Sequence, residues 1–169
     1  MRKIIVILLT ITPLFVFSQN QSKKSIDWMN LSKAEEFSDK YNKNMLLFFY
    51  RPDCEYCEKM KNESLADPSV ISLINENFFP VIINGKSKDP IIYNDTTYLN
   101  NKPNPKDEPS IHNIVRKLVD MKEGNYYWPT IVIINGKHQK IIQGPGFWSK
   151  EQTLRRLKQI ISVRKPIKN

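Results

Sequence analysis

The sequence predicts an α/β fold in which helices cover both faces of a central mixed sheet. The continuous apolar run 45–50 indicates a strand buried on both faces, 78–84 is the next strand, and helical patterns lie between them. A third apolar run, 130–134, leads into Asn135-Gly136, the dipeptide most typical of a β-hairpin, and 140–142 supplies the returning strand. The first two strands need a crossover and should be parallel, whereas the hairpin strands are antiparallel, so the sheet is mixed.

Five helices are expected around these strands. Three start signals support them: Ser32 forms a capping box with Glu35, Asp53 is a suitable N-cap before the second helix, and Ser149 is one before the last. The expected helices cover about 33–42, 54–62, 70–75, 150–163, and 110 to a stop at Gly124.

Residues 1–18 match a removable secretory leader. Arg2-Lys3 precedes the largely apolar stretch 4–17, and a small-residue cleavage pattern ends before Gln19. The apolar stretch is shorter than the roughly 20 residues that cross a bilayer, although an uncleaved N-terminal anchor is the alternative. We therefore expect a mature chain, 19–169, that folds as one domain, is not stably inserted in a membrane, and is periplasmic or secreted.

The stretch 85–109, between the second strand and the fourth helix, differs in composition from the rest of the chain. It is rich in proline and polar residues, interrupted by Tyr93, Tyr98 and Leu99. Because so long a loop is uncommon without structure of its own, we expect a surface insertion, peripheral to the main sheet, that carries a short strand or hairpin. The three apolar side chains should anchor it locally.

The chain is basic, with a net charge of +9 and an excess of Arg and Lys towards its C-terminal end. A basic surface can attract nucleic acid or anionic membranes. Here no nucleic-acid-binding motif accompanies the charge, and the helix macrodipole favours cations at a helix C-terminus. We therefore expect a solvated helix end and no nucleic-acid partner.

Both cysteines of the chain lie in one motif, Cys54-Glu55-Tyr56-Cys57, between a buried strand and a helix start. Unpaired N–H groups at a helix start stabilise a thiolate, which is the nucleophile of disulfide exchange. Cys57 lies about one turn further on and can attack a mixed disulfide that Cys54 has formed. The motif therefore predicts a redox-active pair with Cys54 as the nucleophile and Cys57 as the resolving thiol.

A zinc site and a purely structural disulfide are the two alternatives to a redox-active cysteine pair. A structural zinc site needs four ligands, and the remaining candidates, His112 and His138, are far apart in the sequence. A structural disulfide would close only a small loop, which stabilises a fold less than a long one does. Since a CxxC between a strand and a helix start favours redox chemistry, we expect no metal here.

The arrangement resembles the thioredoxin superfamily over residues 28–161, nearly the whole mature chain. The matching features are the strand 45–50, the CxxC motif, Trp128-Pro129-Thr130 before a strand, and Gly144 after the hairpin. The resemblance implies a thioredoxin fold, a cis Pro129 opposite the thiols, and a substrate segment that pairs with the backbone of Trp128. It also implies disulfide exchange without a cofactor, with protein disulfide substrates and a redox partner protein. We further expect a monomer.

A narrower resemblance and two departures refine this expectation. Residues 53–60, 65–68 and 78–81 look like the secreted thioredoxin-like proteins related to the C-terminal domain of the transmembrane thiol–disulfide interchange protein. Glu55-Tyr56 stands where thioredoxins have Gly-Pro, and Phe48 stands where they have a buried carboxylate. Tyr56 then either contacts the substrate or covers the exposed helix start.

The charges next to Cys54 predict the direction of exchange. Asp53, Glu55 and Glu58 surround it in sequence, and Arg51 is the one cation in 51–58. Nearby negative charge destabilises a thiolate, whereas an exposed helix start stabilises it by about 0.3–1 kcal/mol. A destabilised thiolate lowers the reduction potential, so we expect a reductase. The alternatives are a disulfide-donating oxidase and a binding module in which 85–109 docks a partner.

Overall fold

The computed structural model describes residues 24–101 and 111–164. The expected leader and part of the expected insertion lie outside these ranges. None of the helices within them is long and apolar enough to cross a membrane. The elements are α1 (Leu31–Tyr41), β1 (Met45–Tyr50), α2 (Glu55–Lys59), the π-helix η1 (Met60–Ser64), α3 (Pro68–Asn77), β2 (Phe79–Asn84), β3 (Ile91–Tyr93), β4 (Thr96–Tyr98), α4 (Asn113–Leu118), β5 (Thr130–Ile134), β6 (Lys140–Pro145) and α5 (Lys150–Arg164).

The main sheet has four strands in the order β2-β1-β5-β6. β1 pairs with β2 in parallel, with Met45 opposite Phe79, and with β5 in antiparallel orientation. The hairpin expected around Asn135-Gly136 joins β5 to β6, also antiparallel. The predicted mixed sheet is therefore confirmed, and β1, which leads directly to the cysteine pair, lies in its interior.

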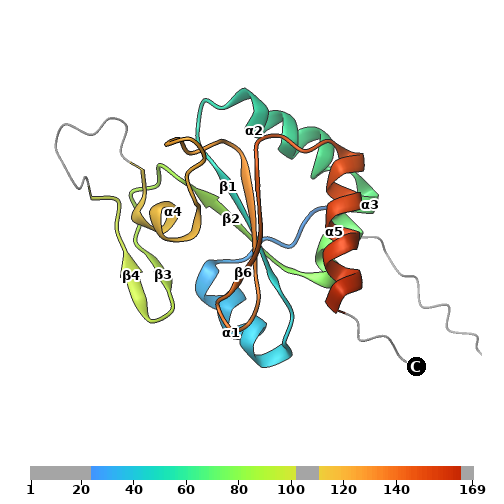
Figure 1. The fold of residues 1–169 in the computed structure, drawn as a ribbon, viewed down its shortest axis with the longest axis horizontal. Helices are drawn as coiled ribbons and strands as arrows, with labels where there is room; N and C mark the ends of the chain where they lie inside the picture. The colour runs from blue at the N-terminus through green and yellow to red at the C-terminus, as the bar shows by residue number, and fades with distance from the viewer. Residues whose placement is uncertain (1–23, 102–110, 165–169) are drawn as a thin grey trace, which may run out of the picture.

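Each face of the sheet carries its own apolar core, because side chains alternate along a strand. On β1, Met45, Leu47 and Phe49 point into a core closed by α1, α4 and the β3–β4 hairpin. The intervening Leu46 and Phe48 point into the other core, which holds residues of η1, α3 and α5. Figure 1 shows α2, α3 and α5 on one side of the sheet and α4 with the hairpin on the other. Helices on both faces confirm the predicted architecture.

The first helix does not begin as predicted. Its N-cap is Asn30, whose side-chain oxygen accepts an N–H of the first turn at 2.8 Å. Ser32 and Glu35, the expected capping box, instead bind the β3–β4 hairpin: Ser32 Oγ donates to the carbonyl of Ile92 at 3.4 Å, and Glu35 Oε1 accepts from the N–H of Asn94 at 2.8 Å. Ser32 and Glu35 therefore make a tertiary contact with the hairpin in place of the local capping box that the sequence predicts.

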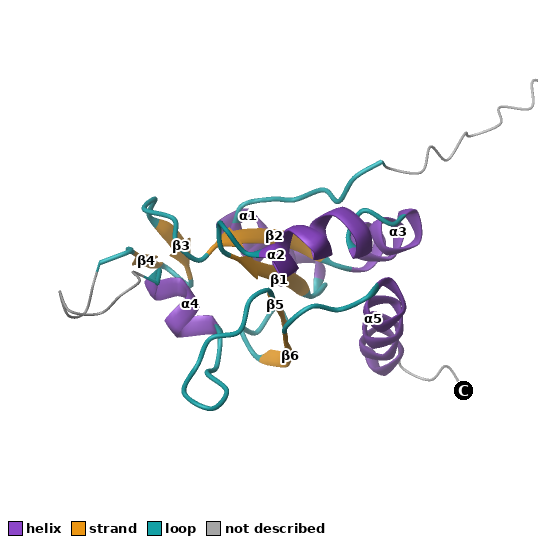
Figure 2. Ribbon diagram, turned by 90° about the horizontal axis from the view of Figure 1, so that it is seen from above, coloured by secondary structure: helices purple, strands orange, loops and turns teal. Residues whose placement is uncertain are grey.

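The described part of the insertion forms the expected hairpin, as a two-stranded sheet of its own beside the main one. Figure 2 shows it at the end of the molecule opposite α5. Tyr93 is 2% exposed and belongs to the core under α1 and α4. Tyr98 packs against the same core, as expected, but the predicted anchorage by Leu99 is wrong because its side chain is exposed.

The fourth helix is shorter than predicted. Its expected start at 110 lies outside the described residues, and it ends at Leu118 rather than at Gly124. Beyond it, the side-chain amide of Gln143 on β6 accepts from the N–H of Asp120 and donates to its carbonyl, both at 2.7 Å. These bonds replace the helical ones, and Met121, which the longer predicted helix would have included, is exposed.

Candidate functional site

The cysteine pair sits where β1 gives way to a helix. The turn after β1 places Asp53 in the left-handed region, at φ 58°, so Asp53 is not the N-cap as predicted. Cys54 itself takes that position: its Sγ accepts from the N–H of Cys57 at 3.2 Å, and its carbonyl accepts from the N–H groups of Cys57 and Glu58. The helix start is therefore directed at the sulfur, as the sequence argument requires.

The two cysteines are joined in a disulfide, with their Cα atoms 5.2 Å apart. Cys54 retains 8% of its surface, whereas Cys57 is completely buried. Of the two residues, only Cys54 keeps any exposed surface. This difference matches the expected division into an attacking and a resolving thiol, although the roles themselves stay predictions.

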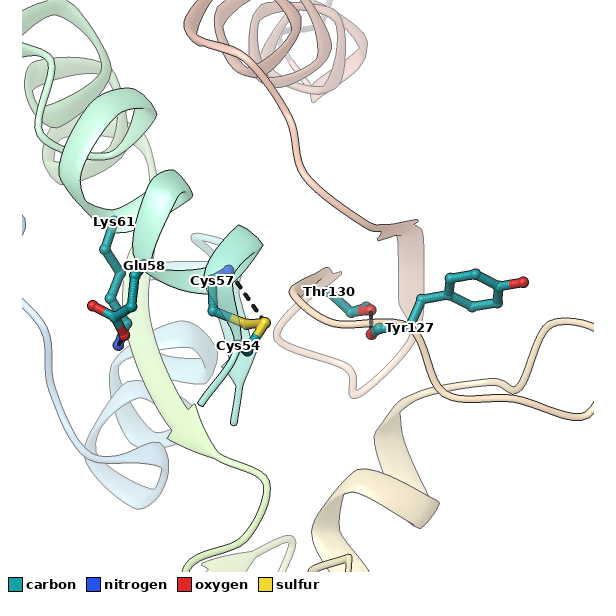
Figure 3. Close-up of a disulfide and its surroundings, with 6 residues drawn as sticks. All are labelled: Cys54, Cys57, Glu58, Lys61, Tyr127 and Thr130. Carbon is teal, nitrogen blue, oxygen red and sulfur yellow. Dashed lines mark hydrogen bonds and ion pairs between the residues drawn. A yellow bond between two sulfur atoms is a disulfide. The ribbon is translucent and has the colours of Figure 1, made fainter. Parts of the chain in front are cut away.

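The segment before β5 runs past the disulfide. Figure 3 shows Thr130 on the side towards the two cysteines and the phenol of Tyr127 pointing away from them. The peptide bond between Trp128 and Pro129 is cis, as expected. Thr130 Oγ1 donates to the carbonyl of Tyr127 at 2.6 Å, and the N–H of Gly146 donates to the carbonyl of Pro129 at 2.7 Å. Both ends of this short segment are thus fixed.

The main chain of Trp128 is left available between these two fixed points. Neither its N–H nor its carbonyl forms a hydrogen bond with another residue that the structure describes. An extended segment of a substrate could therefore pair with it, as the resemblance implies. The substrate-binding role of Trp128 and Pro129 stays a prediction. The bracing hydroxyl of Thr130 was missed, although its place directly after Trp128-Pro129 could have indicated it.

Tyr56 lies on the open side of the pair. It is 60% exposed, and its ring centroid is 6.5 Å from that of Phe147. Lys59 Nζ stands 5.2 Å from the centre of the Phe147 ring. Phe147 is partly buried against the core on this face. These side chains form a mixed aromatic and cationic rim beside the start of α2, where Tyr56 is free to contact a substrate.

The local charge is less acidic than the sequence suggests. Asp53 and Glu55 are exposed, but Glu58 forms an ion pair of 2.8 Å with Lys61, one turn further along. Glu58 is therefore an exposed helix residue, as favoured by the rarity of buried glutamate. Phe48 is fully buried in the position where thioredoxins have a carboxylate, so that proton acceptor is absent.

The two histidines considered as zinc ligands are both engaged elsewhere. His112 is fully buried: its Nδ1 accepts from the N–H of Ile114 at 3.1 Å, and Nε2 lies 3.1 Å from the carbonyl of Asp89. His138 Nδ1 lies 3.2 Å from the hydroxyl of Tyr93. Within the described ranges, no group of three or more His, Cys, Asp or Glu side chains is placed to hold a metal ion.

Comparison with known proteins agrees with this geometry. A thioredoxin-like domain matches residues 31–161. A thioredoxin from Thermus thermophilus has a similar structure, with a TM-score of 0.58 and 16% identity over 81% of this chain and 88% of that one. The DsbH oxidoreductase gives 0.57 and 14% identity, over 94% and 95%. No curated protein sequence matches the chain.

A further similar structure has a lower TM-score and supports no conclusion about the narrower resemblance. The C-terminal domain of DsbD from Neisseria meningitidis, in its reduced form, is among the similar structures, with a TM-score of 0.49 and 17% identity over 76% of this chain and 92% of that one. At these identities, structural likeness establishes a shared fold alone. The matched domain, the strand order and the disulfide at the start of α2 together show that the chain belongs to the thioredoxin-like family.

Proposed function

We propose that this protein is an extracytoplasmic thiol–disulfide oxidoreductase that reduces disulfides in other proteins. The observation that carries the proposal is the unequal exposure of a disulfide placed at a helix start, with Cys54 8% exposed and Cys57 completely buried. In the dithiol form, the Cys54 thiolate attacks one substrate sulfur, forms a mixed disulfide and releases the other sulfur as a thiolate. The Cys57 thiolate then attacks Cys54, which restores the internal disulfide and releases the second substrate thiol.

Two electrons pass to the substrate in each cycle, so a dithiol redox partner protein must reduce the Cys54–Cys57 disulfide again. The reductive direction is supported by the exposed carboxylates of Asp53 and Glu55, which destabilise a thiolate at Cys54. Two features favour the thiolate instead. Lys61 pairs with Glu58, and the N–H of Cys57 donates to the Cys54 sulfur. The reductive direction therefore depends on the effect of Asp53 and Glu55 on the Cys54 thiolate.

The extracytoplasmic location is supported by the leader pattern of residues 1–18. It suits the chemistry, because structural disulfides form and persist outside the reducing cytoplasm. Cleavage of the leader would give a mature chain that begins at Gln19 and has no stable membrane insertion. Mass spectrometry of the N-terminus of the protein recovered from the extracytoplasmic fraction checks this.

Activity measurements on Cys54→Ser and Cys57→Ser test the function. We expect Cys54→Ser to abolish reduction of insulin, because the attacking thiolate is removed, while the thermal midpoint shows that the fold is kept. Cys57→Ser is the matched control: it should still attack, and should therefore accumulate a mixed disulfide that dithiothreitol releases. Full insulin reduction by Cys54→Ser would exclude the proposal, whereas an unaffected biological role of this variant would favour a thioredoxin-fold binding module.

Equilibration against a glutathione series tests the direction. With the dithiol fraction read by alkylation, we expect a potential nearer the roughly −270 mV of thioredoxin than the roughly −120 mV of strong disulfide donors. Asp53→Asn with Glu55→Gln should make the potential less negative, since both changes stabilise the thiolate. A strongly oxidising wild type would instead identify a disulfide-donating oxidase.

A further inference from the structure

The residue that precedes the insertion's hairpin, Gly85, lies beneath the indole ring of Trp128. A Cβ built on Gly85 would stand 2.1 Å from Cη2, 2.7 Å from Cζ3 and 3.2 Å from Cζ2 of that ring. All three atoms belong to the far edge of the benzo ring, so the ring rests directly on the glycine. Any other residue at this position would have to displace it.

Space, and not backbone conformation, is what requires glycine at position 85. Its φ lies outside the left-handed region, so alanine could adopt the same backbone without strain. The residue is also buried. Glycine here is therefore specific to the contact with Trp128, and an added methyl group acts on that ring and on little else.

Two backbone hydrogen bonds fix Gly85, on which the Trp128 ring rests, relative to the redox pair. Its N–H donates to the carbonyl of Tyr50 at 2.7 Å, at the end of the strand that leads to Cys54. Its carbonyl accepts from the N–H of His112, the N-cap of α4, at 2.9 Å. The surface under Trp128 is therefore joined to the same strand that positions the attacking sulfur.

Trp128 is held at three points as a result. Its ring rests on Gly85, while the carbonyls on either side of its peptide unit, those of Tyr127 and Pro129, are held by Thr130 and Gly146. A ring pushed away from Gly85 must turn about its side-chain bonds or move the main chain between these two held carbonyls. That main chain is the part left available for pairing with a substrate.

We propose that Gly85 is a positioning residue: by supporting the ring of Trp128, it sets the position of the main chain that pairs with a substrate beside the disulfide. The inference rests on the proposed function and deepens it. An extended polypeptide substrate must pair along the main chain of Trp128, whereas a small disulfide needs only to reach Cys54. The contact between Gly85 and Trp128 thus favours polypeptide disulfides over small ones.

Gly85→Ala in the mature chain tests the proposal with two substrates, insulin and hydroxyethyl disulfide. We expect the ratio of kcat/KM for insulin to that for the small disulfide to fall about tenfold, through a higher KM for insulin, because small misplacements of binding groups cost this much or more. A ratio equal to that of the wild type would overturn the proposal. A wild type inactive toward both substrates would instead overturn the proposed function.

A double-mutant cycle separates the effect of the contact between residue 85 and the Trp128 ring from a general effect of the substitution on the fold. In a Trp128→Leu background the obstructing ring is gone, so Gly85→Ala should change the ratio by less than about twofold. An equal effect in both backgrounds would show that the ring is not the cause, and would refute the proposal.

Two further measurements test the contact, and the first applies even if Gly85→Ala folds poorly. Trp128→Phe keeps the glycine but shortens the ring that rests on it, so it should also lower the ratio; an unchanged ratio refutes the proposal. With 5-fluorotryptophan incorporated, ¹⁹F spectra give one resonance for each of the three tryptophans. Gly85→Ala should shift the Trp128 resonance most, and a shift spread equally over all three would contradict the assignment.

Discussion

At the scale of single residues, Tyr93 links the insertion to the core and should make stability depend on alkaline pH. Its hydroxyl lies 3.2 Å from His138 Nδ1, and burial, with the nearby Glu35 carboxylate, raises the pKa of Tyr93 to about 12 from its usual value of 10.0. The folded state thus holds this proton more tightly than the unfolded state does. The stabilisation is complete below pH 10 and is lost as the pH rises towards 12.

We therefore expect the free energy of unfolding of the wild type to fall between pH 9 and pH 11 by about 1 kcal/mol more than that of Tyr93→Phe. Urea unfolding at a series of pH values measures this. Tyr41→Phe, which removes an exposed phenol, is the matched control. Identical pH dependence in Tyr93→Phe and the wild type would contradict the account of Tyr93.

At the scale of elements, the β3–β4 hairpin is expected to stabilise the fold without defining it. Ile91 and Tyr98 are cross-strand partners at its base, so a Gly-Gly link can replace 91–98 without moving the chain on either side. The replacement removes the buried Tyr93 and the partners of Ser32 and Glu35, so we expect a loss of about 3 kcal/mol in the free energy of unfolding. Urea unfolding and far-UV circular dichroism measure the loss and the retained secondary structure.

Ile92→Ala is the control for this replacement, because Ile92 is exposed in the same hairpin and its truncation should leave stability within about 0.5 kcal/mol of the wild type. Since Gly85 and His112 are kept, the replacement should also preserve the preference for polypeptide disulfides. A chain that unfolds completely, or one that loses no stability, would each contradict this assignment.

At the scale of the whole molecule, the two cores meet on β1, and protection from hydrogen exchange should reflect this. β1 is flanked by β2 and β5 and is buried on both faces, whereas β3 and β4 pair only with each other in the described chain. Because local opening is cheapest where few apolar contacts are lost, amides of β1 should exchange slowest and those of β4 much faster. Native-state exchange followed by NMR tests this order, and equal protection in β1 and β4 would contradict it.

The sequence alone determined the fold class, the strands and the position of the redox pair. These features depend on local signals: apolar runs of strand length, the hairpin dipeptide Asn135-Gly136, and two cysteines between a strand and a helix start. The cap at Ser149 is of the same kind, and it forms with Gln152, whose side chain accepts from the N–H of Ser149 at 3.1 Å. Each such signal is complete within a few consecutive residues, so no knowledge of the packing is needed.

The tertiary structure decided what depends on residues distant in the chain. Ser32 and Glu35 have the spacing of a capping box, but the hairpin offers them partners 60 and 59 positions away. The fourth helix ends early because Gln143 binds the backbone that would have continued it. Asn84-Gly85 is a turn dipeptide, but the lack of space for any side chain at position 85 exists only because the ring of Trp128 packs onto it. A sequence shows which groups can form a bond, whereas packing decides which of several competing partners comes within reach.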